Sequence, residues 1–325
     1  MRLRARKHSS LLASAFFSWI IIAFFLAGFG YSQGLEGMSY PTRPINFIIP
    51  LPPGEASEIS IRLLLSSAEK HLGQSIVPIN KPGAGLTIGI SEIARAKPDG
   101  YTIGFSAFGP MLVTPLLQKV VYDPVADFVQ IMQFSLSNPG LVVRADSPYK
   151  SVKDLINQAR RGPKKLTFGA IAMGLNPTIM QKIAKKEGVG FNHMPYAGVV
   201  QAEMSLLGGH IDMASGDFSS SLLDAGKTRL LAIYREERAD EYPQVPILKE
   251  LGYDIPCRLY FGVQAPKGVP DAMIKRLEEA FTKAIKEPGF IKGMKELRYP
   301  IVYRNSKELN EFVARGFQTY KEFFK

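Results

Sequence analysis

The chain has 325 residues, of which 46% are hydrophobic and 21% are charged, and its formal net charge is +11. This balance is typical of a soluble globular protein long enough for two domains, and it excludes a chain too polar to form a core. The basic residues are scattered without an interleaved aromatic stripe, so we do not expect nucleic acid as a partner. Cys257 is the only cysteine, which excludes an internal disulfide and favours a small buried side chain over a reactive thiol.

The first thirty residues have the layout of an export signal. Four basic residues lie within the first seven positions without an acid, and residues 11–29 carry no charge. We therefore expect a signal peptide over approximately 1–30 and a periplasmic mature protein. An uncleaved membrane anchor is the alternative, because a membrane span needs roughly 20 apolar residues and this run falls just short of that length.

The first third of the mature chain alternates between strand and helix patterns. Compact apolar runs predict strands at 44–50, 75–80 and 101–106. Apolar residues at helical spacing predict one helix that begins near Glu58 and ends at Gly73, and a second over 88–96. This alternation predicts a mostly parallel sheet with helices on both faces.

The same alternation continues toward the C-terminus. Ser151 is the expected N-cap of a helix that follows a strand beginning at Leu141, because Asp154 stands three positions later. Further strands are predicted at 166–172, 191–198, 210–215 and 229–234. Further helices are predicted at 178–186, 271–286 and 308–324. Another is predicted between 198 and 210, where it contains Ala202, Met204, Leu206 and Leu207.

Two strand-to-helix loops, 50–58 and 169–178, contain glycines that allow tight turns and close approach of the backbone. In open α/β sheets, ligands bind at the carboxyl ends of strands, where helix N-termini offer free N–H groups and a partial positive charge. We therefore interpret both loops as candidate ligand-binding loops. Ordinary strand-to-helix turns are the alternative that the two loops alone leave open.

Nine segments in collinear order connect the chain with one family. They are YPTRPINFIIPLPPGEASE, INKPGAGLTIG, AKPDGYTIGF, VYDPVADF, SVKDLINQAR, HMPYAG, LLGGHIDM, VPILKELGY and FGVQAPKGVP. Together they resemble the receptor component of tripartite tricarboxylate transporters, the Bug family of periplasmic solute-binding proteins.

The resemblance implies an α/β, type II periplasmic-binding-protein fold, with two α/β lobes, crossing strands and a central ligand cleft. Lobe 1 would comprise 40–140 plus 255–325, and lobe 2 would comprise 141–254. The implied function is that of a receptor, expected to be monomeric and without a cofactor, which captures a small organic carboxylate or related solute by hinge closure. It would deliver this solute to integral membrane transporter subunits.

The resemblance also indicates which residues contact the ligand. In the family, the loops that match 51–58 and 170–178 hold one ligand carboxylate, largely through backbone amides and water. We select as ligand-binding candidates Pro52, Pro53, Gly54, Glu55, Ala56, Ser106, Ala172, Gly174, Leu175, Asn176, Tyr196 and Asp217.

Three of these candidates, and one turn, have alternative interpretations. Ser106 is either a cleft hydroxyl or a turn residue, and Tyr196 either contacts the ligand or packs inside the protein. Asp217 either caps a helix or binds a ligand amine or hydroxyl. For the turn that contains Asn80 and Gly83 we favour a structural role.

The candidate loops depart from the family pattern. Glu55 stands where a second glycine is common, and the second loop has apolar residues such as Ile171 and Leu175 where serines and a histidine are common. Glu55 would repel a ligand carboxylate if it points into the cleft; if it points outward, which we favour, it complements the dipole of its helix. We therefore hypothesise a ligand that is less acidic or more apolar than a citrate-type tricarboxylate.

Two rival functions are a periplasmic enzyme and a sensor that presents its ligand to a membrane signalling partner. The four histidines are isolated, and the sequence contains no HExxH, GxSxG, CxxC or P-loop pattern. These absences give no support to a catalytic or metal site, so we expect a protein that is not an enzyme. The sequence does not separate a transport receptor from a sensor.

Overall fold

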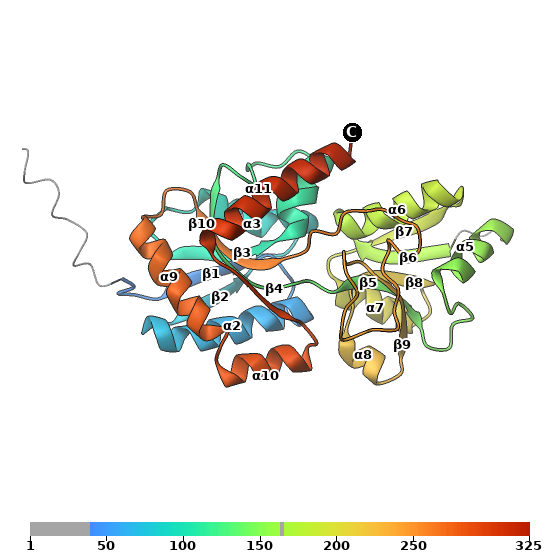
Figure 1. The fold of residues 1–325 in the computed structure, drawn as a ribbon, viewed down its shortest axis with the longest axis horizontal. Coiled ribbons are helices and arrows are strands. Elements are labelled where there is room, and N and C mark those ends of the chain that lie inside the picture. Colours follow the sequence, from blue (N-terminus) through green and yellow to red (C-terminus); the bar gives the residue numbers. More distant parts are fainter. Residues whose placement is uncertain (1–39, 163–165) are drawn as a thin grey trace, which may run out of the picture. The chain divides into compact units, whose positions relative to one another are not determined.

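The computed structural model describes residues 40–162 and 166–325, which form two mixed β-sheets with helices on both faces (Figure 1). The predicted signal peptide lies outside the described residues. The first sheet has the strand order β11-β4-β10-β3-β1-β2. Its strands are β1 (Ile45–Ile49), β2 (Ile76–Asn80), β3 (Thr102–Ala107), β4 (Phe128–Ser135), β10 (Phe261–Pro266) and β11 (Ile301–Arg304).

The second sheet has the order β7-β6-β8-β5-β9. Its strands are β5 (Pro139–Arg144), β6 (Leu166–Ile171), β7 (Phe191–Tyr196), β8 (Met213–Asp217) and β9 (Thr228–Ile233). We call the first sheet with its helices lobe 1, and the second sheet with its helices lobe 2. The chain passes from β4 into β5 and returns between β9 and β10, so it crosses between the lobes twice. The exact lobe boundaries at 140 and 255 stay a prediction.

Helices from distant parts of the chain cover the first sheet. They are α2 (Ala56–Leu72), α3 (Thr87–Arg95), α9 (Asp271–Ala284), α10 (Pro288–Glu296) and α11 (Ser306–Phe323). α2 packs against α9 and α10, while α3 packs on the strands β1, β3 and β10 (Figure 1). Two short helical turns, η1 (Ala84–Leu86) and η2 (Gly109–Val113), and α4 (Thr114–Leu117) complete this lobe.

The second sheet has its own helices on both faces. They are α5 (Val152–Arg161), α6 (Leu175–Glu187), α7 (Val199–Leu207) and α8 (Ser220–Asp224). Ser151 is the N-cap of α5, and its side chain accepts a hydrogen bond of 3.2 Å from the Asp154 backbone, as predicted. Among the described residues, none of the helices combines the length and apolar content needed to span a bilayer.

The prediction of a mostly parallel sheet is right for β1, β2 and β3 and wrong for the sheet as a whole. β10 pairs antiparallel with both β3 and β4, and β11 pairs antiparallel with β4. The second sheet is mixed in the same way, because β5 pairs antiparallel with β8 and β9. β5 and β10, the strands that follow the two crossings between lobes, each pair antiparallel with both of their neighbours.

α2 and α6 begin earlier than the sequence predicts, and both differences concern the candidate loops. α2 begins at Ala56 with Glu55 as its N-cap, and it ends before Gly73, whose φ of 74° is the left-handed stop that was predicted. α6 begins at Leu175 rather than 178. Pro177 lies in its first turn, where the missing N–H costs no intrahelical hydrogen bond. Both helices therefore place candidate residues at their first turns.

Gly104 in β3 tests how tightly the first sheet is packed. A Cβ at this position would lie 2.4 Å from Cδ1 of Ile93 and 2.7 Å from the backbone oxygen of Ile48. We expect Gly104→Ala to lower the free energy of unfolding by about 1–3 kcal/mol, since a backbone atom cannot yield as a side chain does. Urea denaturation measures this loss. Gly289→Ala is the matched control, because a Cβ there meets nothing within 4 Å; equal stability of the two variants would contradict the prediction.

Candidate functional site

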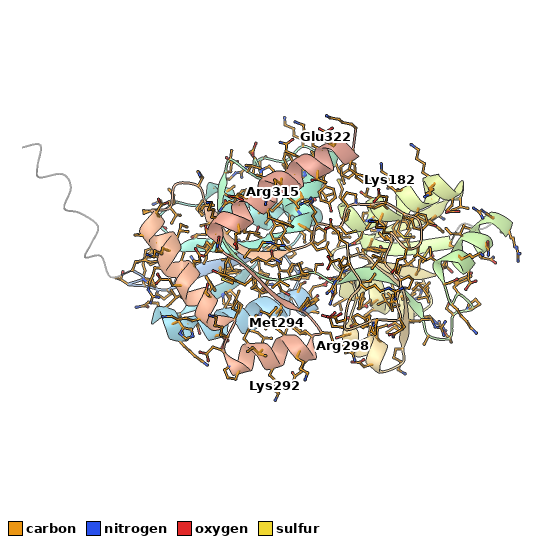
Figure 2. The ribbon with its side chains drawn as sticks, viewed as in Figure 1. Lys182, Lys292, Met294, Arg298, Arg315 and Glu322 are labelled. Atoms are coloured by element: carbon orange, nitrogen blue, oxygen red, sulfur yellow. The ribbon has the colours of Figure 1, made fainter. Side chains whose placement is uncertain are left out.

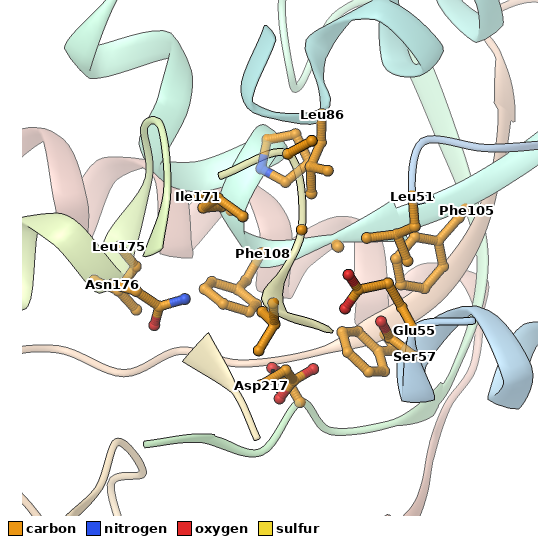
Figure 3. A pocket seen from close by; sticks show the side chains of 18 residues that line it. Leu51, Glu55, Ser57, Leu86, Phe105, Phe108, Ile171, Leu175, Asn176 and Asp217 are labelled. Atoms are coloured by element: carbon orange, nitrogen blue, oxygen red, sulfur yellow. Dashed lines mark hydrogen bonds between the residues drawn. The ribbon is translucent and has the colours of Figure 1, made fainter. Parts of the chain in front are cut away.

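A cavity of about 70 Å³ lies where loops from the two lobes meet (Figure 3). Its lining follows the carboxyl ends of β1, β3, β6, β7 and β8, which is where ligands bind in α/β sheets. Apolar side chains form most of the lining: Leu51, Leu86, Phe105, Phe108, Ile171, Leu175, Val199 and Phe261. The polar side chains in the lining are Glu55, Ser57, Ser137, Asn176 and Asp217.

Three helices begin at this cavity. The N-caps of α2, α6 and α7 are Glu55, Gly174 and Gly198, and no N-cap side chain hydrogen-bonds its own helix. The first N–H groups of a helix have no intrahelical partner and carry a partial positive charge. The cavity therefore receives its positive potential from backbone groups.

Glu55 points into the cleft, so the favoured outward orientation was wrong. Its side chain is only 4% exposed, and its Oε1 accepts a hydrogen bond of 3.3 Å from the Val200 backbone in the first turn of α7. A Cβ at Gly198 would lie 2.1 Å from this oxygen, so the contact requires glycine at the N-cap of α7. Glu55 is therefore a lobe 1 carboxylate bound at the start of a lobe 2 helix.

Burial dominates the electrostatics of Glu55. The pKa of Glu55 is raised to about 7, mainly because burial removes its hydration; the Val200 N–H opposes this shift, and the charges of Asp217 and Glu203 add to it. Glu203 is buried in α7, where its Oε1 accepts a hydrogen bond of 2.9 Å from the Ser219 backbone. Burial also raises the pKa of Glu203. Three acidic side chains thus influence one another around the cavity.

Asp217 lies at the end of β8 and has protein partners for both oxygens. Its Oδ1 accepts hydrogen bonds from the Ser137 hydroxyl at 2.8 Å and from the Asn138 backbone, and its Oδ2 accepts one from the Tyr299 hydroxyl at 3.0 Å. Burial raises the pKa of Asp217 to about 6 against the effect of these hydrogen bonds. Asp217 caps no helix; it joins the crossing segment before β5 and the C-terminal part of lobe 1 to lobe 2.

Other contacts also join the lobes outside the cavity. Arg298, which follows α10, forms an ion pair of 2.5 Å with Asp224 of α8, and Lys182 of α6 lies 4.4 Å from the ring centroid of Phe323 of α11. Figure 2 labels both Arg298 and Lys182. Nearer the cavity, a Cβ at Gly85 would lie 3.6 Å from Cβ of Met173, so the turn before α3 touches the loop before α6. The cleft is therefore bridged on several sides.

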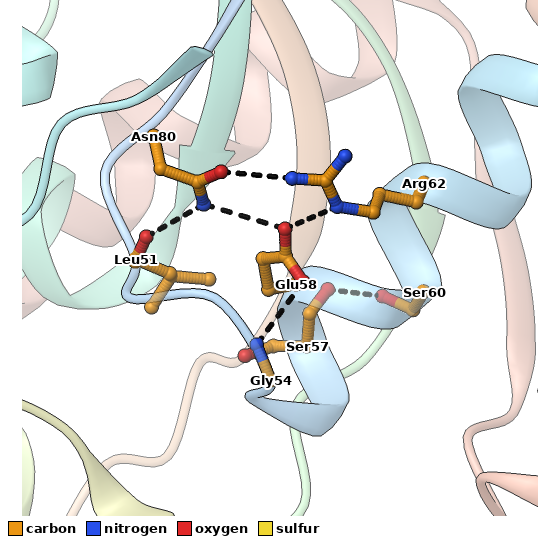
Figure 4. Close-up of polar contacts among 7 residues, drawn as sticks. All are labelled: Leu51, Gly54, Ser57, Glu58, Ser60, Arg62 and Asn80. Carbon is orange, nitrogen blue, oxygen red and sulfur yellow. Dashed lines mark hydrogen bonds and ion pairs between the residues drawn. The ribbon is translucent and has the colours of Figure 1, made fainter. Parts of the chain in front are cut away.

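Glu58 and Asn80 brace the first candidate loop without lining the cavity (Figure 4). Glu58 accepts hydrogen bonds from Arg62 Nε at 2.5 Å and from the Gly54 backbone at 3.4 Å. Asn80 donates to the Leu51 carbonyl at 2.9 Å and accepts from Arg62 at 2.8 Å. These contacts agree with the structural role that we favour for Asn80, and they fix the backbone that presents Glu55.

The structure brings four of the twelve predicted ligand-binding residues to the cavity, namely Glu55, Leu175, Asn176 and Asp217. The other eight flank it or lie elsewhere without lining it: Pro52, Pro53, Gly54, Ala56, Ser106, Ala172, Gly174 and Tyr196. Whether any of the twelve binds a ligand stays a prediction.

Ser106 and Tyr196 both have internal partners. Ser106 is completely buried within β3, where its hydroxyl lies 3.0 Å from that of Tyr260, so it is not a turn residue. Tyr196 donates a hydrogen bond of 2.6 Å to Ser205 of α7. This contact favours the interpretation of Tyr196 as a packed side chain.

Sequence reasoning missed part of the lining. Gly198 and Val199 stand at the strand-to-helix loop between β7 and α7, so the rule that selected the other two loops also finds this one. Phe261 is the first residue of β10, and Ser137 lies two residues before β5; the starts of antiparallel strands carry no such signal. Among residues 40–162 and 166–325, no group of three or more His, Cys, Asp or Glu side chains is arranged to hold a metal ion.

The two mixed sheets, the double crossing between lobes and the cleft at the carboxyl ends of parallel strands define a type II solute-binding protein. The model of the tripartite tricarboxylate transporter family receptor matches residues 60–325, so the chain belongs to this family.

Known relatives agree with this assignment. The chain is 36% identical over 277 residues to the UPF0065 protein in the gbd 5' region of Cupriavidus necator, covering 85% of this chain and 84% of that protein. A solved periplasmic transporter superposes with a TM-score of 0.79 at 30% identity, covering 86% of this chain and 95% of the other. The periplasmic binding protein BugD superposes with a TM-score of 0.78 at 26% identity, covering 88% of this chain and 97% of BugD.

Glu55 makes stability depend on pH. Between its ordinary pKa of 4.5 and its folded pKa of about 7, only the folded chain keeps the proton, so the free energy of unfolding falls as pH rises through this window. Glu55→Gln keeps an acceptor for the Val200 N–H and removes the charge. We expect this variant to be more stable than the wild type by roughly 1–3 kcal/mol above pH 7, with little difference near pH 4.5.

Urea denaturation at a series of pH values measures this difference. Glu92→Gln is the matched control, because Glu92 carries the same charge at the surface, 3.3 Å from Lys81. The free energy of unfolding of this control should depend on pH as in the wild type, where Asp217 also contributes. If the Glu55→Gln variant showed the same pH dependence as the wild type, Glu55 would not be its cause.

Proposed function

We propose that the chain is an extracytoplasmic receptor that captures a small organic carboxylate or related solute by lobe closure and delivers it to a tripartite tricarboxylate-type membrane transporter. The observation that carries this proposal is the cavity between the lobes, because its lining comes from loops of both. A ligand held by both lobes gains contacts only in the closed state and shifts the equilibrium toward closure.

Family membership supports the remaining parts of the proposal. The matched family consists of transport receptors rather than enzymes. We propose a periplasmic location after removal of the N-terminal signal, and a monomer that binds its membrane subunits through the closed lobes. The physical logic is that closure changes the relative position of two surfaces, which a membrane partner can recognise.

The loop contact near Gly85 allows a direct test of closure. In the variant with Gly85→Cys and Met173→Cys, the two Cβ atoms would be 3.6 Å apart, within the range of a disulfide. We expect oxidation to trap the empty cleft and to weaken binding by about tenfold or more, with recovery after reduction. Isothermal titration with 6-hydroxyhexanoate, 4-(hydroxymethyl)benzoate, adipate and citrate measures the binding.

The single variant Met173→Cys is the control, since it cannot bridge the lobes; Cys257 is buried and leaves no accessible native thiol. Unchanged binding in the oxidised double variant would contradict closure over the ligand. Failure of all four solutes to bind the reduced protein would count against the receptor function itself.

A further inference from the structure

The charge around the cavity is negative apart from its backbone groups. Glu55 and Asp217 line it, and the described lining residues include no lysine, arginine or histidine. Glu203 stands close behind, 1% exposed. A negatively charged ligand therefore finds its favourable partners at helix N-termini, and each further negative charge on the ligand meets two acidic side chains.

One of the helix N-termini already holds a carboxylate. Val200 of α7 donates to Glu55 Oε1 at 3.3 Å, and the absence of a side chain at Gly198 gives this oxygen its place. A helix start with free N–H groups is a general binding position for an anion. In this chain a side chain from the opposite lobe supplies that anion.

Asn176 indicates which further chemical group the ligand carries besides a carboxylate. Its side chain is 7% exposed and lines the cavity, and its Oδ1 has no hydrogen-bond partner among the described residues. Figure 3 shows the Asn176 amide beside Phe108, with its nitrogen on the side of the ring. A buried acceptor without a partner is costly, so a ligand that donates a hydrogen bond here gains affinity.

Building on the proposed receptor function, we propose that Glu55 is a specificity-determining residue whose carboxylate fills the anion position at the start of α7. The cavity then takes a mainly apolar solute with a single carboxylate and a neutral hydrogen-bond donor, a hydroxy acid being the simplest example. A second ligand carboxylate would compete with Glu55 for the same N–H groups and be repelled by its charge. The apolar side chains around the cavity favour the carbon skeleton of such a solute.

Matched pairs of solutes test this selectivity. 6-Hydroxyhexanoate and adipate have the same chain length and differ in one carboxylate, and 4-(hydroxymethyl)benzoate and terephthalate form the aromatic pair. By isothermal titration at pH 8, where Glu55 with its pKa of about 7 is mostly ionised, we expect the wild type to prefer the hydroxy acid of at least one pair by about tenfold or more. Glu55→Gln should reduce this preference by a similar factor, while Glu92→Gln should retain it.

A measurement with formate, without any of the larger solutes, tests the anion position by itself. Glu55→Gly removes the internal carboxylate, so formate should occupy the start of α7 and raise the Tm of this variant. The wild type, whose position is filled, should show no such rise. Sodium chloride at the same ionic strength is the control for general salt effects, and circular dichroism verifies that the variant is folded.

The outcomes separate the two proposals. Equal or tighter binding of the dicarboxylate by the wild type in both pairs would overturn the role of Glu55 while leaving the receptor function intact. Equal effects of formate on Glu55→Gly and on the wild type would also overturn it. If no probe binds the wild type but formate selectively stabilises Glu55→Gly, the anion position is supported and the proposed receptor function fails.

Discussion

The carboxyl ends of the parallel strands in both lobes meet at one cavity, and the other features of the site depend on this constraint. Each strand that ends there leads into a loop, and three of these loops continue as helices whose first N–H groups lack intrahelical partners. The site therefore gains positive potential without basic side chains. This arrangement explains why the acidic residues nearby decide which anions fit, since only backbone groups oppose them.

Glu55 and Asp217 have different roles although both are acidic and line the cavity. Asp217 is hydrogen-bonded to residues of the crossing segment and to Tyr299, so its carboxylate joins parts of the two lobes. Glu55 contacts only the start of α7 among the partners described above and could leave it when the lobes separate. Local partners therefore make one carboxylate part of the framework and the other part of the cleft.

The approach of the lobes depends on small residues and on braced loops. Gly198 leaves the space that Glu55 occupies, and Gly85 allows the turn before α3 to reach Met173. On the other side, Glu58 and Asn80 hold the backbone between β1 and α2 in place. A cleft that closes over a small solute needs both features, because mobile loops would lose conformational entropy on binding, and the ligand contacts would have to offset this cost.

The sequence by itself determined the order of strands and helices over 44–106 and 141–207, the cap at Ser151, the stop at Gly73 and the two loops around Glu55 and Leu175, because these follow from local periodicity, capping and glycine. It did not predict β4, β10 or β11. Only the tertiary structure decided that β10 runs antiparallel, that Ser106 faces Tyr260 rather than the cleft, and that Glu55 points inward. These outcomes depend on contacts between residues far apart in the chain. The helix that receives Glu55 begins 144 positions after it, so local sequence carried no signal for their meeting.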